Sequence, residues 1–137
     1  MTNIQSFATS YDEARDKFLA AARIADAWTH RYDNPTKGPK GEVLSTDLAW
    51  LGPQDASKVV VAISATHGVE GYCGSGFQVD WLSSIGAAGL PDDKMPVVAI
   101  EPPTADSTYN TEQMSGRLIE LFGAHFGKDR VVQPKPV

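Results

Sequence analysis

The segments KVVVAIS (58–64) and ATHGVEGYCGSG (65–76) are the part of this sequence that decides its fold. The first is a near-continuous run of β-branched and apolar residues, which is typical of a central strand buried on both faces of an α/β sheet. The second is a glycine-rich loop. A helical pattern follows from about 75 to about 85, and PVVAI (96–100) is a second short buried strand. Strand, loop, helix and strand in this order predict a right-handed parallel βαβ unit.

A helix and a strand are predicted before this unit. The segment TSYDE (9–13) holds a capping box, and apolar residues behind it recur at helical spacing from about 11 to about 28. Asparagine, prolines and glycines between 34 and 41 predict a loop. The period-two pattern over 42–51 predicts a strand. After the βαβ unit, the same reasoning predicts a helix over 112–125 and a short strand over 130–133.

Composition and charge exclude several classes of protein. The chain has 137 residues, enough for one ordinary domain, and a formal net charge of −5, which argues against a nucleic-acid-binding protein. Its single cysteine, Cys73, cannot form an internal disulfide. We find neither an apolar signal core near the N-terminus nor an apolar run long enough to span a membrane. We therefore expect a cytoplasmic protein with no nucleic-acid or membrane partner; its oligomeric state stays open, with a homo-oligomer among the alternatives.

The candidate chemistry lies in the loop, in the sequence THGVEG (66–71). His67 offers an imidazole nitrogen and Glu70 a carboxylate, which are both ordinary zinc ligands. The loop follows a buried strand, at the sheet edge where sites assemble in open parallel sheets. Gly68 and Gly71 would allow the close backbone approach that converging ligands need. A histidine and a glutamate three residues apart also occur together by chance, so the pair alone does not establish a metal site.

Three alternative interpretations of the same segment are less favoured. The glycines of GYCGSG (71–76) could cradle a phosphate at a helix N-terminus, but the spacing matches neither known phosphate-binding fingerprint. Cys73 could be a nucleophile activated by His67, although no third orienting group is evident. Ser75 lacks the flanking residues of a nucleophile elbow.

The loop and its surroundings resemble a known family. KVVVAISATHGVEGYCGSG is similar to the metal-binding segment of a bacterial family, domain of unknown function 2817, within the zinc carboxypeptidase superfamily. The segments SYDEARDKFLAAA, KGPKGE, TDLAWLGP and FQVDWL also match its pattern, in order, over about residues 6–95. The resemblance implies a carboxypeptidase-like α/β fold, with a mixed sheet that has a parallel βαβ core and is flanked by helices. Residues 1–95 would form the N-terminal part of that domain.

The resemblance also implies a metal and a reaction. His67 and Glu70 would be the first two of three zinc ligands. The zinc would polarise a carbonyl and activate water for hydrolysis of an amide or peptide bond in a small-molecule or peptide substrate. A carboxylate elsewhere would serve as general base, and an arginine would hold the substrate carboxylate.

The C-terminal part departs from this pattern. The family continues with Asn-Pro, then Asn-Arg, and later supplies a third ligand and a catalytic glutamate, whereas this chain has EPPT (101–104) and no Asn-Arg pair. The later histidine, His125, falls on an apolar helical stripe, which favours a packing role. Residues 96–137 form a divergent tail, whose part from about 100 is similar to the aminoacylase and hippurate-hydrolase family. We interpret the chain as a join between two truncated hydrolases that is catalytically incomplete; the alternative is a non-catalytic folded remnant or an interaction module.

Overall fold

The structure, a computed structural model, describes residues 4–65, 70–90 and 96–101, which all belong to one compact unit, Met1–Ser107. The elements, in chain order, are the 3-10 helix η1 (Ile4–Ser6), α1 (Tyr11–Ile24), β1 (Trp28–Lys37), β2 (Val43–Leu51), β3 (Val60–Ile63), α2 (Gly71–Ala88) and β4 (Val97–Glu101). The predicted helix over 112–125 and strand over 130–133 lie outside the described residues. Within those residues, no helix has the length and apolar content to cross a membrane.

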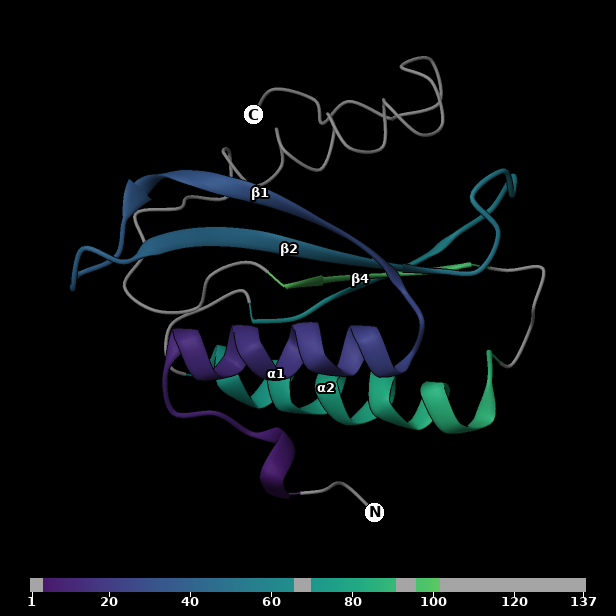
Figure 1. The fold of residues 1–137 in the computed structure, drawn as a ribbon, viewed down its shortest axis with the longest axis horizontal. Coiled ribbons are helices and arrows are strands. Elements are labelled where there is room, and N and C mark those ends of the chain that lie inside the picture. Colours follow the sequence, from purple (N-terminus) through teal and green to yellow (C-terminus); the bar gives the residue numbers. More distant parts are fainter. Residues whose placement is uncertain (1–3, 66–69, 91–95, 102–137) are drawn as a thin grey trace, which may run out of the picture. The chain divides into compact units, whose positions relative to one another are not determined.

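The four strands form one mixed sheet in the order β1-β2-β4-β3. β2 runs antiparallel to both of its neighbours, and β3 and β4 are parallel. Helices α1 and α2 lie side by side on one face of this sheet (Figure 1). The predicted α/β fold and the parallel β3-α2-β4 unit are therefore confirmed.

The capping box at the start of α1 is present. The Ser10 side chain accepts the N–H of Glu13 at 3.3 Å, and the Glu13 carboxylate accepts the backbone N–H of Thr9 at 2.9 Å. Lys17, one turn further on, lies 2.8 Å from the same carboxylate. Hydrogen bonds from Lys17 and Thr9 lower the pKa of Glu13 to about 2. One N–H group that the helix start leaves unpaired, that of Glu13, is thus satisfied, and the reciprocal bond goes to Thr9, the residue before the N-cap.

The predicted helix over 11–28 is too long, because α1 ends at Ile24. Asp26 adopts a left-handed backbone with φ of 55°, which turns the chain back toward the sheet. Trp28, whose spacing fits the helical stripe, instead begins β1 and pairs with Trp50 across the sheet. Cross-strand pairing therefore outweighs the helical pattern here.

The predicted loop over 34–41 is wrong in its first half, because β1 continues to Lys37. The register of β1 against β2 shifts between Asp33 and Lys37. Pro35, which cannot donate to a ladder, falls inside this irregularity. Proline is tolerated in this way on an edge strand at a bulge, so the proline bends the strand without ending it.

The prediction that KVVVAIS forms a central strand is also wrong for the described sheet. β3 is an edge strand and pairs with β4 alone among the described residues. The positions that are buried on both faces of the sheet lie instead in β2 and β4, where residues 44–51 and 97–100 are buried. β2 and β4 are central because each has a neighbour on both sides, so position in the sheet and not composition decides burial.

The core lies between the helix pair and the sheet. Its buried cluster comes from both helices and from the central strands: Phe18, Ala21, Ala22, Ala49, Leu51, Val79, Leu82, Ile85 and Ala99. Phe77 lies outside this cluster: it is 54% exposed and packs edge-on against Phe7, with ring centroids 5.6 Å apart. Phe7 also covers Gly76, where a Cβ atom would clash with its ring. The N-terminal segment therefore occupies the face of α2 that carries Phe77.

Two substitutions on α2 test this assignment of faces. Leu82 has no exposed surface, so Leu82→Ala should lower the free energy of unfolding by about 2–5 kcal/mol. Phe77→Ala, on the outer face of the same helix, should cost about 1 kcal/mol or less. Urea denaturation of the two variants measures both. Equal costs, or the reverse order, would show that the helix is rotated from the orientation described here.

Candidate metal centre

The loop with the predicted metal ligands leaves the sheet at the carboxyl ends of β3 and β4. The Ser64 N–H donates to the Ile100 carbonyl oxygen at 3.1 Å, so the two parallel strands end side by side. Ala65 follows, 2% exposed, with a left-handed φ of 61°. A non-glycine residue in this conformation is uncommon and tends to occur where a chain must turn sharply at a functional site. The loop thus begins with a buried, sharp turn.

Of the two predicted ligands, Glu70 is described and His67 lies outside the described residues. Glu70 occupies the N-cap position of α2, in helical backbone conformation, and its side chain makes no capping hydrogen bond. Its backbone carbonyl accepts the Cys73 N–H at 3.0 Å, while the side chain is exposed. A carboxylate at a helix N-terminus is favoured by the helix dipole. The Glu70 oxygens are therefore accessible to a ligand at this sheet edge.

The fit to zinc can be judged for Glu70 alone. An exposed, uncapped carboxylate is a suitable oxygen donor for zinc, and the metal-binding role of Glu70 stays a prediction. Within residues 4–65, 70–90 and 96–101, no group of three or more histidine, cysteine, aspartate or glutamate side chains could hold a metal ion. The convergence of His67 and Glu70 stays a prediction, as does the packing role of His125, which lies outside the described residues.

The structure changes the alternative interpretations of the segment after Glu70. GYCGSG (71–76) was considered a phosphate-cradling loop, but α2 begins at Gly71 and the segment is helical. The backbone of Gly71 is not in the left-handed conformation. The φ angle at this position therefore does not require a glycine. Cys73 is exposed and free in the first turn of α2. Its activation by His67 remains untested.

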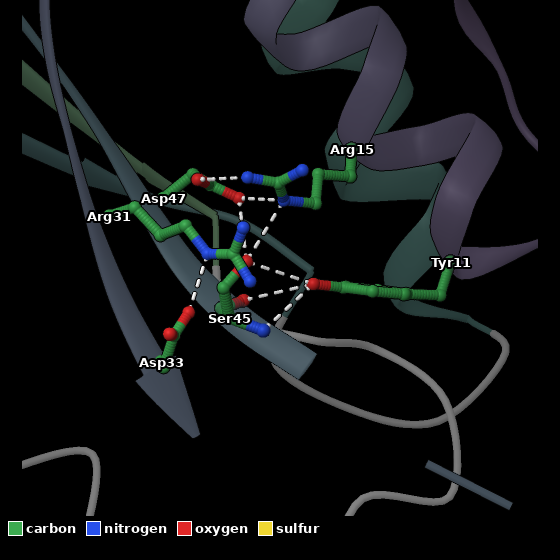
Figure 2. Close-up of polar contacts among 6 residues, drawn as sticks. All are labelled: Tyr11, Arg15, Arg31, Asp33, Ser45 and Asp47. Atoms are coloured by element: carbon green, nitrogen blue, oxygen red, sulfur yellow. Dashed lines mark hydrogen bonds and ion pairs between the residues drawn. The ribbon is translucent and has the colours of Figure 1, made fainter. Parts of the chain in front are cut away.

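A buried polar cluster, which the sequence analysis missed, connects α1 to β2 (Figure 2). The Arg15 guanidinium binds both carboxylate oxygens of Asp47, with Nε–Oδ2 at 2.6 Å and Nη2–Oδ1 at 3.0 Å. The Ser45 hydroxyl accepts from Arg15 Nε at 2.9 Å and donates to Asp47 at 3.0 Å. The Tyr11 hydroxyl accepts the Ser45 N–H at 2.8 Å and lies 3.0 Å from Ser45 Oγ.

The electrostatics of this cluster follow from its burial. Asp47 has a side chain only 3% exposed, and Arg15 one that is 24% exposed. Burial alone would lower the pKa of Arg15, but the hydrogen bond and the charge of Asp47 outweigh it and raise that pKa. Burial raises the pKa of the Tyr11 hydroxyl, although its bonds to Ser45 act in the opposite direction. The Arg15–Asp47 pair is thus a charge-assisted, bidentate contact, which is stronger than a neutral hydrogen bond.

The cluster also lies toward the sheet edge that carries the candidate loop. Asp47 is the cross-strand partner of Glu101, the last residue of β4. The sequence contains a signal for this cluster. Tyr11 and Arg15 are four residues apart, which places them on one face of a helix, and Ser45 and Asp47 are two apart, which places them on one face of a strand. Neither pattern alone shows that the two faces meet.

A second ion pair lies nearby on β1. The Arg31 Nε is 2.5 Å from Asp33 Oδ1, with side chains 44% and 66% exposed. Arg31 is also the cross-strand partner of Asp47, and Figure 2 shows it beside the buried cluster. Exposed pairs of this kind contribute little to stability, so the buried cluster is the more important contact between these elements.

A cleft of about 330 Å³ opens at the other end of the helices. It is lined by the last residues of α1, β2 and α2, among them Ile24, Leu51 and Ile85. Glu70, the described one of the two predicted ligands, lies instead at the N-terminal end of α2. This cleft is therefore separate from the candidate metal centre.

The raised pKa of Tyr11 predicts a loss of stability in alkali. Its folded pKa lies above the ordinary value of 10.0, so its contribution is complete below pH 10 and is lost as pH rises through the folded pKa. Tyr11→Phe should lower the free energy of unfolding by about 1–3 kcal/mol at neutral pH, because the Ser45 N–H loses its partner. The same variant should flatten the alkaline loss.

Urea denaturation at several pH values between neutrality and strong alkali measures both effects. Tyr72→Phe, at a half-buried site on α2, serves as the control and should retain the alkaline loss. An unchanged alkaline slope in Tyr11→Phe would contradict the role given to this hydroxyl.

Solved structures share the fold. The glutaminyl cyclase of Macrostomum lignano superposes with a TM-score of 0.61 at 10% identity, covering 91% of this chain and 44% of that chain. The glutaminyl cyclase of Fimbriiglobus ruber gives 0.56 at 9% identity, covering 82% and 47%. A Zn-dependent exopeptidase from Parabacteroides distasonis ATCC 8503 gives 0.46 at 10% identity, covering 74% and 44%, and we draw nothing from so low a score. The chain spans less than half the length of these proteins.

Sequence comparison gives a firmer result than superposition. No curated protein matches the chain. The family described as "Protein of unknown function (DUF2817)" matches residues 7–102, which agrees with the resemblance over 6–95 and extends it through the end of β4. The likeness of the tail to the aminoacylase family stays a prediction. On the match over 7–102, the chain belongs to the family of proteins of unknown function DUF2817.

Proposed function

We propose that this chain carries part of the site of a zinc-dependent hydrolase that acts on amide or peptide bonds, with His67 and Glu70 as metal ligands. The observation that supports the proposal most is the state of Glu70. Its carboxylate is exposed, makes no capping hydrogen bond, and follows His67 by three residues at the carboxyl edge of the parallel strands. Side chains at that edge are well placed for a site in α/β folds.

The residues of the chain would have the following roles in such a site. The His67 imidazole and the Glu70 carboxylate would hold the ion from a loop whose ends are fixed by β3 and α2. Zinc bound there would supply a Lewis acid that polarises a substrate carbonyl and activates water. The general base, the third ligand and the group that binds the substrate carboxylate have no assignment in the described residues.

A second candidate is a folded domain without catalytic activity, or an interaction module. It is favoured by one observation: the segment that begins at the end of β4 reads EPPT (101–104), and no Asn-Arg pair follows it. The two candidates differ in whether the chain binds zinc and in whether bound zinc produces turnover.

Zinc titration against a chromogenic chelator separates these candidates. We expect one zinc per chain, bound more weakly than at a site with three protein ligands. His67→Ala and Glu70→Gln should each reduce the affinity by about tenfold or more, which corresponds to at least about 1.4 kcal/mol. Asp55→Asn, which removes an exposed carboxylate elsewhere, is the matched control and should bind like the parent chain. Equal affinity in all four proteins would exclude the proposed ligands.

Turnover is measured on N-acyl amino acids and small peptides with zinc present. A peptide with N-terminal glutamine is added because the structural neighbours are glutaminyl cyclases. We expect rates well below those of ordinary peptidases, since loss of general acid–base help typically costs about 100- to 10,000-fold. Ordinary peptidase rates that His67→Ala abolishes would show the site to be complete. Absence of zinc binding would favour the non-catalytic domain.

A further inference from the structure

The start of α2, which follows directly on Glu70, has few of the features that stabilise a helix from within. Glu70 makes no capping hydrogen bond, and no acidic residue follows it in the first turn. Three glycines lie in the first six residues, GYCGSG (71–76). Glycine in a helix is less stable than alanine because it loses more conformational freedom on folding. These turns are therefore prone to open unless other parts of the chain hold them closed.

The position of Glu70 depends on these same turns. Its backbone is helical, and its carbonyl oxygen accepts the Cys73 N–H at 3.0 Å. If the first turn of α2 opened, this bond would be lost and the Glu70 carboxylate would no longer have a fixed place at the sheet edge. A ligand that needs the carboxylate in that place therefore favours the closed form of the helix start.

Phe7, from the segment before α1, packs over this stretch of α2. A Cβ atom at Gly76 would clash with the Phe7 ring, so the ring lies directly against the helix where the glycine has no side chain. Phe77, the next residue, meets the same ring edge-on, with ring centroids 5.6 Å apart. Gly76 follows Glu70 by six residues, which is about 9 Å along the helix axis. Phe7 therefore covers the glycine-rich turns close to Glu70.

The segment that carries Phe7 is fastened to both helices. From α1, the Lys17 ammonium donates to the Phe7 carbonyl oxygen. On the other side, the Ser6 hydroxyl donates to the Asp80 carboxylate of α2 at 3.4 Å. These contacts hold the ring on Gly76, so the start of α2 is supported from outside the helix.

We propose that Phe7 is a positioning residue for Glu70: its ring, packed on Gly76, keeps the glycine-rich start of α2 closed and so holds the carboxylate where it would bind zinc. The inference rests on the zinc-binding role proposed for Glu70. Zinc and the docked Phe7 ring then favour the same form of the helix, so each strengthens the binding of the other. Without the ring, the closed form is only partly populated, and the apparent affinity for zinc falls by that fraction.

Zinc titration of the full chain tests this coupling. Phe7→Ala should weaken zinc binding by about fivefold. Ile24→Ala is the matched control, because Ile24 packs in the same way on Gly86 near the other end of α2, and it should bind zinc like the parent chain. Circular dichroism verifies that the variants are folded.

A second substitution shows whether Phe7 acts through the helix start. Gly74→Ala raises the stability of the helix, and its Cβ atom would make only ordinary contacts, 3.5 Å from the nearest atoms of Ser64 and Ala65. Combined with Phe7→Ala, it should restore the zinc affinity. Alone, it should change the affinity by less than about twofold, because the turns are already closed in the parent chain.

Hydrogen exchange without zinc gives a measurement that does not depend on the metal. In Phe7→Ala, the amides of residues 74–78 should exchange faster by a larger factor than those of residues 82–86 in the same helix. An equal increase at both ends would show that Phe7 contributes only to general stability, and would overturn the proposal. Unchanged zinc affinity in Phe7→Ala, or a loss that Gly74→Ala does not restore, would overturn it as well.

The parent chain alone provides a further test, which decides the matter if Phe7→Ala does not fold. Because the coupling is reciprocal, saturating zinc should slow exchange at residues 74–78 and at the Phe7 amide, which donates to the Ile4 carbonyl oxygen at 3.3 Å. Zinc that binds without protecting the Phe7 amide would contradict the proposal. If the parent chain binds no zinc, the proposed function fails, whereas the exchange pattern of Phe7→Ala still decides whether Phe7 holds the start of α2.

Discussion

The ion pair between Arg15 and Asp47 is the contact on which the arrangement of this fold depends. Asp47 is buried on a central strand, where an unpaired carboxylate would be strongly unfavourable. Arg15 reaches it from α1 with two hydrogen bonds, and Ser45 and Tyr11 satisfy the remaining groups. A slip of β2 by one residue would turn Asp47 to the opposite face, away from α1. The charge therefore specifies both the face of the sheet on which α1 packs and the register of the central strand.

That register determines where the candidate site lies. β2 pairs with β4 so that Asp47 is opposite Glu101, and β4 pairs with β3 so that Ile63 is opposite Ile100. The carboxyl ends of the two parallel strands consequently meet beside the part of β2 that α1 anchors. Ala65 turns the chain at this edge with a left-handed backbone, and α2 begins six residues later at Gly71. β3 and α2 hold the two ends of the loop that carries His67.

Local signals in the sequence were sufficient for much of this structure. The capping box at Glu13 and the βαβ unit depend on residues close in the chain, so their patterns predict them directly. β1 and the edge position of β3 were not predictable in this way, because both depend on which strands become neighbours. Trp28 fits a helical stripe and a cross-strand pair equally well, and only its partner Trp50 decides between them. The metal-binding roles of His67 and Glu70 stay predictions, whereas the place of Glu70 at the carboxyl edge of the sheet follows from the order of strand, loop and helix in the sequence.

β3 also bears on the proposed metal site, because it leads directly into the loop that carries His67. The strand ends at Ile63, and His67 follows four residues later. An edge strand of four residues, paired on one side, loses its order more easily than a central one, because fewer hydrogen bonds and contacts oppose local opening. Catalytic and metal-binding groups need rigid support within a fraction of an ångström, so the hydrogen bonds between β3 and β4 are the contacts on which the position of the proposed zinc ligands depends.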